Sequence, residues 1–217
     1  MPLNLKAALI KAQRELPGKD PAVIAGRANV DYEPAKVERG RFLLPYFGEW
    51  YALEFPEGDV GLASEQDRPP AQRGAVPVIT QVLLLHYLLN ASGGRLAGTW
   101  VSYHELPQGQ TYERAFQQRA IAPLEGAFGY DREGFIAAGV AAGGERARLG
   151  DASFYFRVLP KLPLMCILWT GDEDVPPGAN ILFDAAAGAY LPGEDLAYLG
   201  IALTARMLGA KRGALLT

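Results

Sequence analysis

The sequence is poor in the residue types that build metal and redox centres. Its 217 residues include one cysteine, Cys166, and two histidines, His86 and His104. A single thiol can neither form an internal disulfide nor supply a zinc or iron–sulfur site that needs several thiolates. Because Cys166 lies within the apolar run LMCILW, we expect it to be a small buried side chain without reactivity.

An excess of positive charge and a long apolar segment are also missing. Lys and Arg number 21 against 24 Asp and Glu, so the net charge is -3. Nucleic-acid-binding proteins are usually basic, with their cations gathered on one face, and we therefore expect no nucleic-acid partner. No stretch approaches the ~20 apolar residues of a membrane span, and residues 1–16 have no continuous apolar core like that of a signal peptide. We expect a cytoplasmic protein without a membrane anchor.

The motifs of common nucleotide and hydrolase sites are absent as well. The chain contains no G-x-x-x-x-G-K-[ST], no G-x-S-x-G and no H-E-x-x-H. The pair Gly143–Gly144 follows an expected helix, whereas the glycine-rich loop of a dinucleotide-binding fold follows a strand. Motifs therefore assign no catalytic residue, cofactor or metal, and the sequence leaves open whether the chain is an enzyme.

The first third of the chain predicts two helices and a β-hairpin. Asn4 is suited to cap one helix, and Asp20 to cap a second helix that ends near Asn29. Residues 39–55 alternate between apolar and polar side chains on both sides of a turn, which is typical of a hairpin. A short strand near Val60–Leu62 is expected in the loop that follows.

The rest of the chain predicts a buried helix, several amphipathic helices and a set of strands. The segment PVITQVLLLHYLLN, residues 77–90, is apolar almost all round, which is typical of a helix inside a domain. The run Leu164–Trp169 is apolar on both faces, as expected of a central strand. Further strands are expected over 99–106, 152–158 and 181–183. Further helices are expected over 111–128 with a kink near Pro123, over 131–142 with Asp131 as its cap, and over 195–208.

Together these elements predict an α+β fold. Neighbouring strands without helical crossovers between them favour antiparallel pairing. We expect a mostly antiparallel sheet, with the helix at about 77–90 buried at the centre and the other helices flanking it. Since no linker or internal repeat is visible, we predict one domain over 1–217, in which residues 1–30 form a helical appendage.

Acidic residues that follow the expected strands are the first candidate site. Asp172 and Asp174 come after Trp169, Asp184 ends the next strand, and Asp195 opens the last helix. If they met around one cleft, their repulsion would raise carboxyl pKa values or recruit a cation such as Ca²⁺ or Mg²⁺. The local alternatives are a solvated acidic turn, backbone hydrogen bonding at the strand end and helix capping.

A second group of candidates lies on the strand expected over 99–106. In an extended strand Trp100, Ser102 and His104 share one face, and Glu105 lies on the other. Side chains two residues apart project in parallel, so the serine and the histidine form no catalytic triad. Trp100 and Trp169 both lie on expected strands, where tryptophan usually packs in the core. Trp169 ends the central strand, so it can instead form the floor of a pocket for a flat ligand.

His86 lies on the helix expected to be buried. In a purely structural role, His86 would be a neutral imidazole that donates one hydrogen bond and accepts another. The functional alternatives are a metal ligand, an axial ligand or a general base, because a helix in the core holds a side chain rigidly.

Three long motifs are QVLLLHYLL (81–89), TWVSYHELPQG (99–109) and a tail over 158–200 that contains LMCILWTGDEDVPPGANILFD. They resemble an uncharacterised bacterial and archaeal domain family of unknown function, found mainly in anaerobes. Some members of that family are fused to an iron–sulfur module like that of corrinoid proteins in one-carbon metabolism. This chain lacks the cysteines for such a module, so the resemblance implies that any redox role would need a partner, an iron–sulfur or corrinoid protein. No catalytic residue can be carried over from the family.

Three hypotheses about function follow. The first is a non-catalytic accessory or small-ligand-binding domain in anaerobic metabolism, near corrinoid or one-carbon enzymes, with a small molecule or a protein as partner. Its cleft would be lined by Trp100, Trp169, Asp172, Asp174 and Asp184, with His86 near the floor. The second is a metal-dependent or acid–base enzyme that uses His86, Glu105 and the Asp172–Asp174 loop. The third is a tetrapyrrole or corrinoid binder with His86 as axial ligand.

Overall fold

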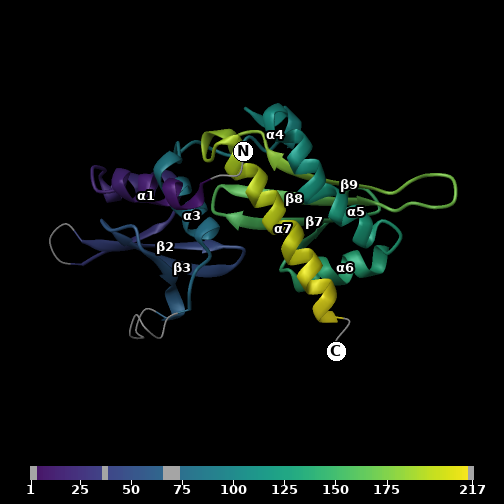
Figure 1. Cartoon of the computed structure of the whole chain (residues 1–217), viewed down its shortest axis with the longest axis horizontal. Helices are drawn as coiled ribbons and strands as arrows, with labels where there is room; N and C mark the ends of the chain where they lie inside the picture. Colours follow the sequence, from purple (N-terminus) through teal and green to yellow (C-terminus); the bar gives the residue numbers. More distant parts are fainter. Residues whose placement is uncertain (1–3, 36–38, 66–73, 215–217) are drawn as a thin grey trace. The chain divides into compact units, whose positions relative to one another are not determined.

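The computed structural model describes residues 4–35, 39–65 and 74–214, and it confirms an α+β fold with two antiparallel sheets (Figure 1). The contacts within the chain divide it into two compact units. The N-terminal unit comprises residues 1–95, 159–161 and 189–191, and the C-terminal unit comprises 96–158, 162–188 and 192–217. We describe each unit by itself, and the predicted single domain stays a prediction.

Over its described residues, the N-terminal unit combines a four-stranded antiparallel sheet with three α-helices. The sheet has the order β1-β2-β3-β4. Its strands are β1 (Asp31–Pro34), β2 (Gly40–Tyr46), β3 (Glu49–Phe55) and β4 (Val60–Leu62), and its helices are α1 (Leu5–Glu15), α2 (Pro21–Ala28) and α3 (Val78–Asn90), with a single 3-10 turn at Ala63–Glu65. Both α1 and α2 pack against α3.

Local sequence signals explain most of this unit. The Asn4 side chain accepts a hydrogen bond from the Ala7 backbone N–H, and the Asp20 side chain accepts one from Ala22, so both predicted helix caps are confirmed. Phe47 and Gly48 have φ values of 50° and 78°, as the tight turn of a two-residue hairpin requires. The predicted hairpin is confirmed. The predicted burial of α3 is confirmed as well, because seven of its residues are buried.

The C-terminal unit contains a five-stranded antiparallel sheet in the order β5-β9-β8-β7-β6. The strands are β5 (Trp100–Ser102), β6 (Glu145–Ala147), β7 (Ala152–Leu159), β8 (Leu162–Trp169) and β9 (Gly178–Asp184). The apolar run predicted to be a central strand is β8, the middle strand of the sheet. Its residues from Leu162 to Leu168 are all buried, which confirms the prediction.

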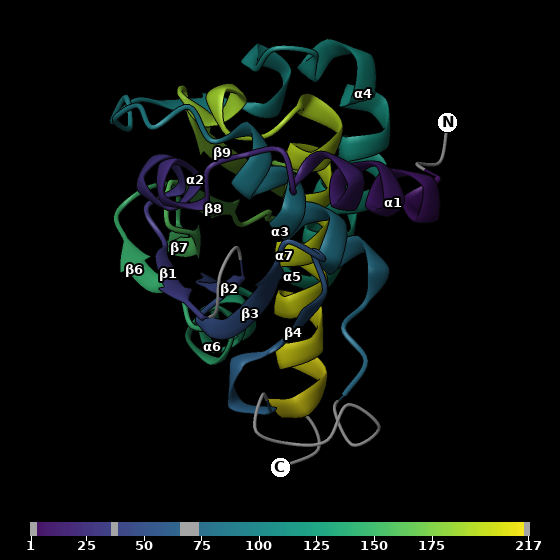
Figure 2. The ribbon, with the colours of Figure 1, turned by 90° about the vertical axis from the view of Figure 1, so that its left-hand side faces the viewer.

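The helices of the C-terminal unit cover one face of this sheet. Figure 2 shows α4, α5 and α7 to one side of the strands. The Phe183 ring of β9 lies 6.0 Å from the Phe116 ring of α4, and the Phe154 ring of β7 lies 5.8 Å from the Phe135 ring of α6. The helices are α4 (Gly109–Phe116), α5 (Ala122–Phe128), α6 (Arg132–Ala141) and α7 (Gly193–Ala214), with a π-helical segment at Gln117–Ile121 and single 3-10 turns at Tyr103–Glu105 and Ala187–Ala189.

Two details of the predicted elements change. The strand expected over 99–106 ends at Ser102, because the backbone N–H and hydroxyl of Ser102 both donate to Glu105 and turn the chain into the 3-10 helix. His104 therefore does not share a strand face with Trp100, and that part of the prediction was wrong. The kink expected in the helix over 111–128 takes the form of the π-helical segment, which precedes Pro123.

Candidate functional site

The face of the C-terminal sheet opposite Phe183 carries four of the predicted site residues. In the strand register Trp100 lies beside Asp184, Ser102 beside Leu182, and Leu182 beside Met165. Side chains alternate between the two faces of a strand, so Trp169 shares the face of Met165. We call this surface the tryptophan face; it consists of Trp100, Ser102, Met165, Ile167, Trp169, Asn180, Leu182 and Asp184.

The two ends of the tryptophan face lie far apart. Trp169 pairs with Gly178 at one end of β9, and Trp100 pairs with Asp184 at the other end. Six residue steps at ~3.3 Å each separate these ends by about 20 Å. The acidic loop that carries Asp172 lies beyond the first end. The loop and Asp184 therefore do not surround one cleft, because a straight strand holds them apart.

Asp184 serves the local structure at its end of the face. Its carboxylate is 4% exposed and accepts hydrogen bonds from the backbone N–H groups of Ala97 (2.9 Å), Gly98 (2.8 Å) and Ala186 (2.9 Å). Three of the roughly four lone-pair positions of the carboxylate are therefore taken by backbone donors. The Trp100 ring is half-buried and approaches the Tyr155 ring to 6.0 Å.

Ser102 and Glu105 form a capping box at the end of β5. The backbone N–H and the hydroxyl of Ser102 donate to Glu105 Oε2, each at 2.7 Å. These hydrogen bonds stabilise the charged carboxylate and lower the pKa of Glu105. The Glu105 side chain is exposed, so the pair organises the turn into the 3-10 helix and lines no enclosed pocket.

The remaining candidates, Asp195 and His86, belong to different units. Asp195 is buried in the first turn of α7, in the C-terminal unit. The pKa of Tyr112 is raised, first by burial and then by the negative charges of Glu194 and Asp195. His86 is half-buried on α3 of the N-terminal unit. Over residues 4–35, 39–65 and 74–214, no group of three or more His, Cys, Asp or Glu side chains is arranged to hold a metal ion.

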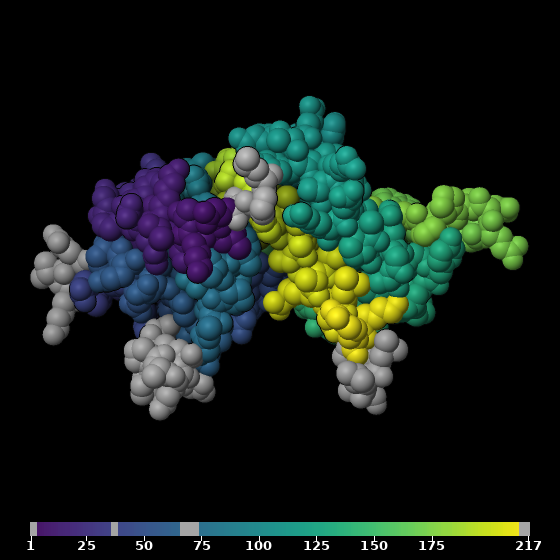
Figure 3. Space-filling view, viewed as in Figure 1, coloured from purple at the N-terminus to yellow at the C-terminus, as the bar shows by residue number. Residues whose placement is uncertain are grey.

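The other end of the tryptophan face exposes several large apolar side chains. Trp169 is 44% exposed, and Tyr130, Leu149 and Val175 are exposed as well. We call this region the loop end; it consists of residues 129–132, 148–151 and 169–178. The loop between β8 and β9 projects here from the C-terminal unit (Figures 1 and 3).

Backbone hydrogen bonds fasten the three segments of the loop end to one another. The Gly171 N–H donates to the Gly129 carbonyl at 2.9 Å, the Thr170 N–H donates to the Asp151 side chain at 2.7 Å, and the Asp151 N–H donates to the Leu168 carbonyl at 2.9 Å. A β-carbon placed on Gly171 would come within 2.9 Å of the Tyr130 ring, which shows how closely that ring packs against the loop base. The exposed aromatic residues thus stand on a fixed support.

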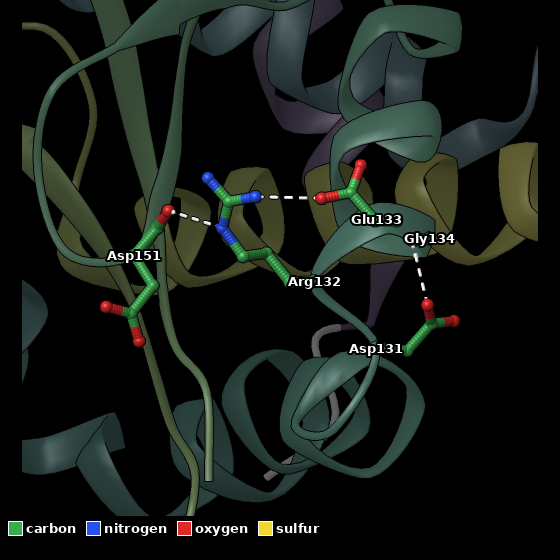
Figure 4. A network of polar contacts seen from close by, with 5 residues as sticks. All are labelled: Asp131, Arg132, Glu133, Gly134 and Asp151. Carbon is green, nitrogen blue, oxygen red and sulfur yellow. Dashed lines mark hydrogen bonds and ion pairs between the residues drawn. The ribbon is translucent and has the colours of Figure 1, made fainter.

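Charged side chains reinforce the same support (Figure 4). The Arg132 guanidinium donates to the Asp151 carbonyl at 3.0 Å and to Glu133 at 2.8 Å. Asp131 accepts from the Gly134 N–H at 2.8 Å and caps α6, as the sequence predicted. Lys211 of α7 also lies 2.8 Å from Asp131, and its hydrogen bond is the largest contribution that lowers the Asp131 pKa.

The acidic loop itself is a turn held by Asp172. Its carboxylate accepts from the N–H groups of Asp174 (2.9 Å) and Val175 (2.8 Å), and these bonds lower the pKa of Asp172. Glu173 and Asp174 are exposed at the tip and give it negative charge. Sequence reasoning found Trp169 and these acids but missed Tyr130 and Leu149, because single apolar residues in turns produce no periodic pattern.

Comparisons with known proteins identify one family. The model of a family described as "Domain of unknown function (DUF3786)" matches residues 20–206, a range that includes the tryptophan face and the loop end. Neither a search of curated proteins nor a search of solved structures found a match. Among the described helices, none is both long enough and apolar enough to cross a membrane.

Proposed function

The chain belongs to the family described as a domain of unknown function (DUF3786), and on that premise we propose that it is a non-catalytic accessory domain. It binds its partner through the loop end. The observation that carries the proposal is the exposure of Trp169 on a support that hydrogen bonds hold rigid. An exposed tryptophan beside other apolar side chains is typical of a binding surface, since burying it contributes strongly to affinity.

The carboxylates support binding over acid–base catalysis. A general acid or base works best with a pKa near the working pH. Glu105 and Asp172 instead have lowered pKa values, because each accepts hydrogen bonds that stabilise its charge. Asp184 is occupied by three backbone N–H groups. These residues hold turns in shape, which favours a scaffold that presents a surface.

The setting of this function rests on the resemblance of the motifs. We place the chain in the cytoplasm, in anaerobic metabolism near corrinoid or one-carbon enzymes, and take an iron–sulfur or corrinoid protein as its partner. A chain with a single cysteine cannot bind an iron–sulfur cluster through several thiolates, so in this proposal the partner binds the cluster. A small-molecule ligand bound at the same aromatic surface is the alternative.

The proposal is tested by purifying the tagged chain from the organism that encodes it and quantifying the bound proteins and small molecules by mass spectrometry. The variants are Trp169→Ala, Tyr130→Ala and, as a control, Trp50→Ala, whose side chain is 51% exposed in the N-terminal unit. We expect the Trp169→Ala chain to lose its partner by about 10-fold or more, as hot-spot residues do. Equal recovery with Trp169→Ala, or no bound partner with any chain, would refute the proposal.

A further inference from the structure

The N-terminal unit contains a hollow of about 220 Å³ beside α2 and the last turn of α3. Its apolar lining includes Val23 and Ile24 of α2 and Leu88 and Leu89 of α3. Leu88 and Ile24 are buried, whereas Val23 is 47% exposed. An exposed valine beside a hollow offers apolar surface that a bound molecule can cover.

Arg27 supplies positive charge to the same hollow. A β-carbon placed on Gly93 would lie 3.1 Å from the Arg27 Cγ and 3.4 Å from its Cα, so the Gly93 backbone packs along the side-chain stem. Gly93 has a φ of 81°, a conformation that favours glycine. In the part of the chain that the structure describes, the Arg27 guanidinium has no ion pair or hydrogen bond, although its stem is held in place.

The other charged residues of the lining have protein partners. Lys19, in the turn that follows α1, lies 3.5 Å from Glu15 at the end of that helix, and Asp20 caps α2 by accepting from Ala22 and Val23. An exposed lysine–glutamate pair contributes little attraction of its own. Arg27 is therefore the cation best placed to pair with a ligand, and its fork of N–H donors matches a carboxylate.

We propose that the hollow between α2 and α3 binds a small aliphatic carboxylate, with its chain on Val23, Ile24 and Leu88 and its carboxylate on Arg27. At ~30 Å³ for each water-sized group, the hollow has room for about seven non-hydrogen atoms. Pentanoate has this size. The site lies in the N-terminal unit and does not depend on the loop end, so it stands or falls separately from the proposed function.

The test titrates the full chain, labelled with ¹⁵N, with pentanoate, pentanol and pentylamine and follows backbone amide shifts by NMR. We expect pentanoate to bind with a dissociation constant on the order of 1 mM and to shift the amides of Ala25, Gly26, Ala91 and Gly93. Pentanol and pentylamine should bind about 10-fold more weakly, because neither forms the charged hydrogen bonds with Arg27.

Two variants and a matched control complete the experiment. Arg27→Gln and Val23→Asp should each weaken pentanoate binding about 10-fold, the first by removing the cation and the second by adding a like charge. Arg14→Gln changes an exposed arginine of α1 outside the hollow and should leave the affinity unchanged. Equal binding of pentanol and pentanoate, shifts confined to other residues, or unchanged affinity in Arg27→Gln would overturn the inference.

Discussion

The structural role of Asp184 gives the sharpest quantitative prediction. Its Oδ1 accepts from Ala97 and Ala186, and its Oδ2 accepts from Gly98. Asp184→Ala removes both acceptor oxygens and all three hydrogen bonds, and each buried donor without a partner costs about 1–3 kcal/mol. The surrounding backbone is partly buried, so the low end applies and the free energy of unfolding should fall by about 3 kcal/mol.

The variant Asp184→Asn keeps the size of the side chain, so it separates the loss of the charged acceptor from the loss of the side chain itself. In Asp184→Asn the amide oxygen can replace Oδ1 and keep two hydrogen bonds, whereas the amide NH₂ then faces the Gly98 N–H, donor against donor. We expect a loss of about 1.5–2 kcal/mol. Asp174→Asn alters an exposed acid at the loop tip and should change stability by less than about 0.5 kcal/mol.

Urea unfolding at pH 7 measures these differences in the free energy of unfolding. The comparison requires that the m-value, the slope of that free energy against urea concentration, is the same for all variants. The expected order of destabilisation is Asp184→Ala, then Asp184→Asn, then Asp174→Asn. If Asp184→Asn were as stable as the unchanged chain, the three hydrogen bonds would not hold the loops as described. Asp184 would then be available for a different role.

Three further predictions concern other parts of the fold. Burial raises the pKa of the Cys166 thiol to about 12, so a thiol reagent at about pH 8 should modify Cys166 rapidly only after the chain is unfolded in denaturant. Gly200→Ala should destabilise the chain by about 1–3 kcal/mol in urea unfolding, because the new β-carbon would come within 2.4 Å of a phenylalanine ring of α4. Gly209→Ala, in open space on the same helix, should instead stabilise it by up to about 1 kcal/mol. Because the Asp131 pKa is lowered in the folded chain, its contribution is present above the ordinary carboxyl pKa and is lost as the pH falls through the lowered value. Asp131→Asn should therefore cost less than about 1 kcal/mol near pH 7 and progressively less as the pH falls below the ordinary carboxyl pKa, and a cost that does not change with pH would contradict the assignment.

Elements controlled by their own residues could be predicted from the sequence. The Asn4, Asp20 and Asp131 caps, the hairpin turn and the buried helix α3 all depend on contacts within a few residues or on strong apolar patterns. The central position of β8 followed from a run that is apolar on both faces. The short strands β1 and β6 were missed, because three or four mostly exposed residues on an edge strand show no apolar–polar alternation.

Turns set by a single side chain and contacts between distant segments could not be predicted. The 3-10 turn after Ser102 depends on one side chain accepting two hydrogen bonds, and the alternating pattern beyond it resembled a strand. The predicted meeting of Asp172 with Asp184 failed because their separation depends on the length of β9 and on the strand register. Tyr130 belongs to the loop end because the neighbouring Gly129 carbonyl accepts from the Gly171 N–H and the Tyr130 ring packs beside Gly171.

The most direct test of the binding surface is photo-crosslinking inside the organism that encodes the chain. A benzophenone amino acid replaces Trp169 in one chain and Trp50, the other strongly exposed tryptophan, in the control. We predict one dominant protein adduct from position 169 and none from position 50. No adduct at position 169, or the same adducts from both positions, would contradict the assignment of the loop end as the partner-binding surface.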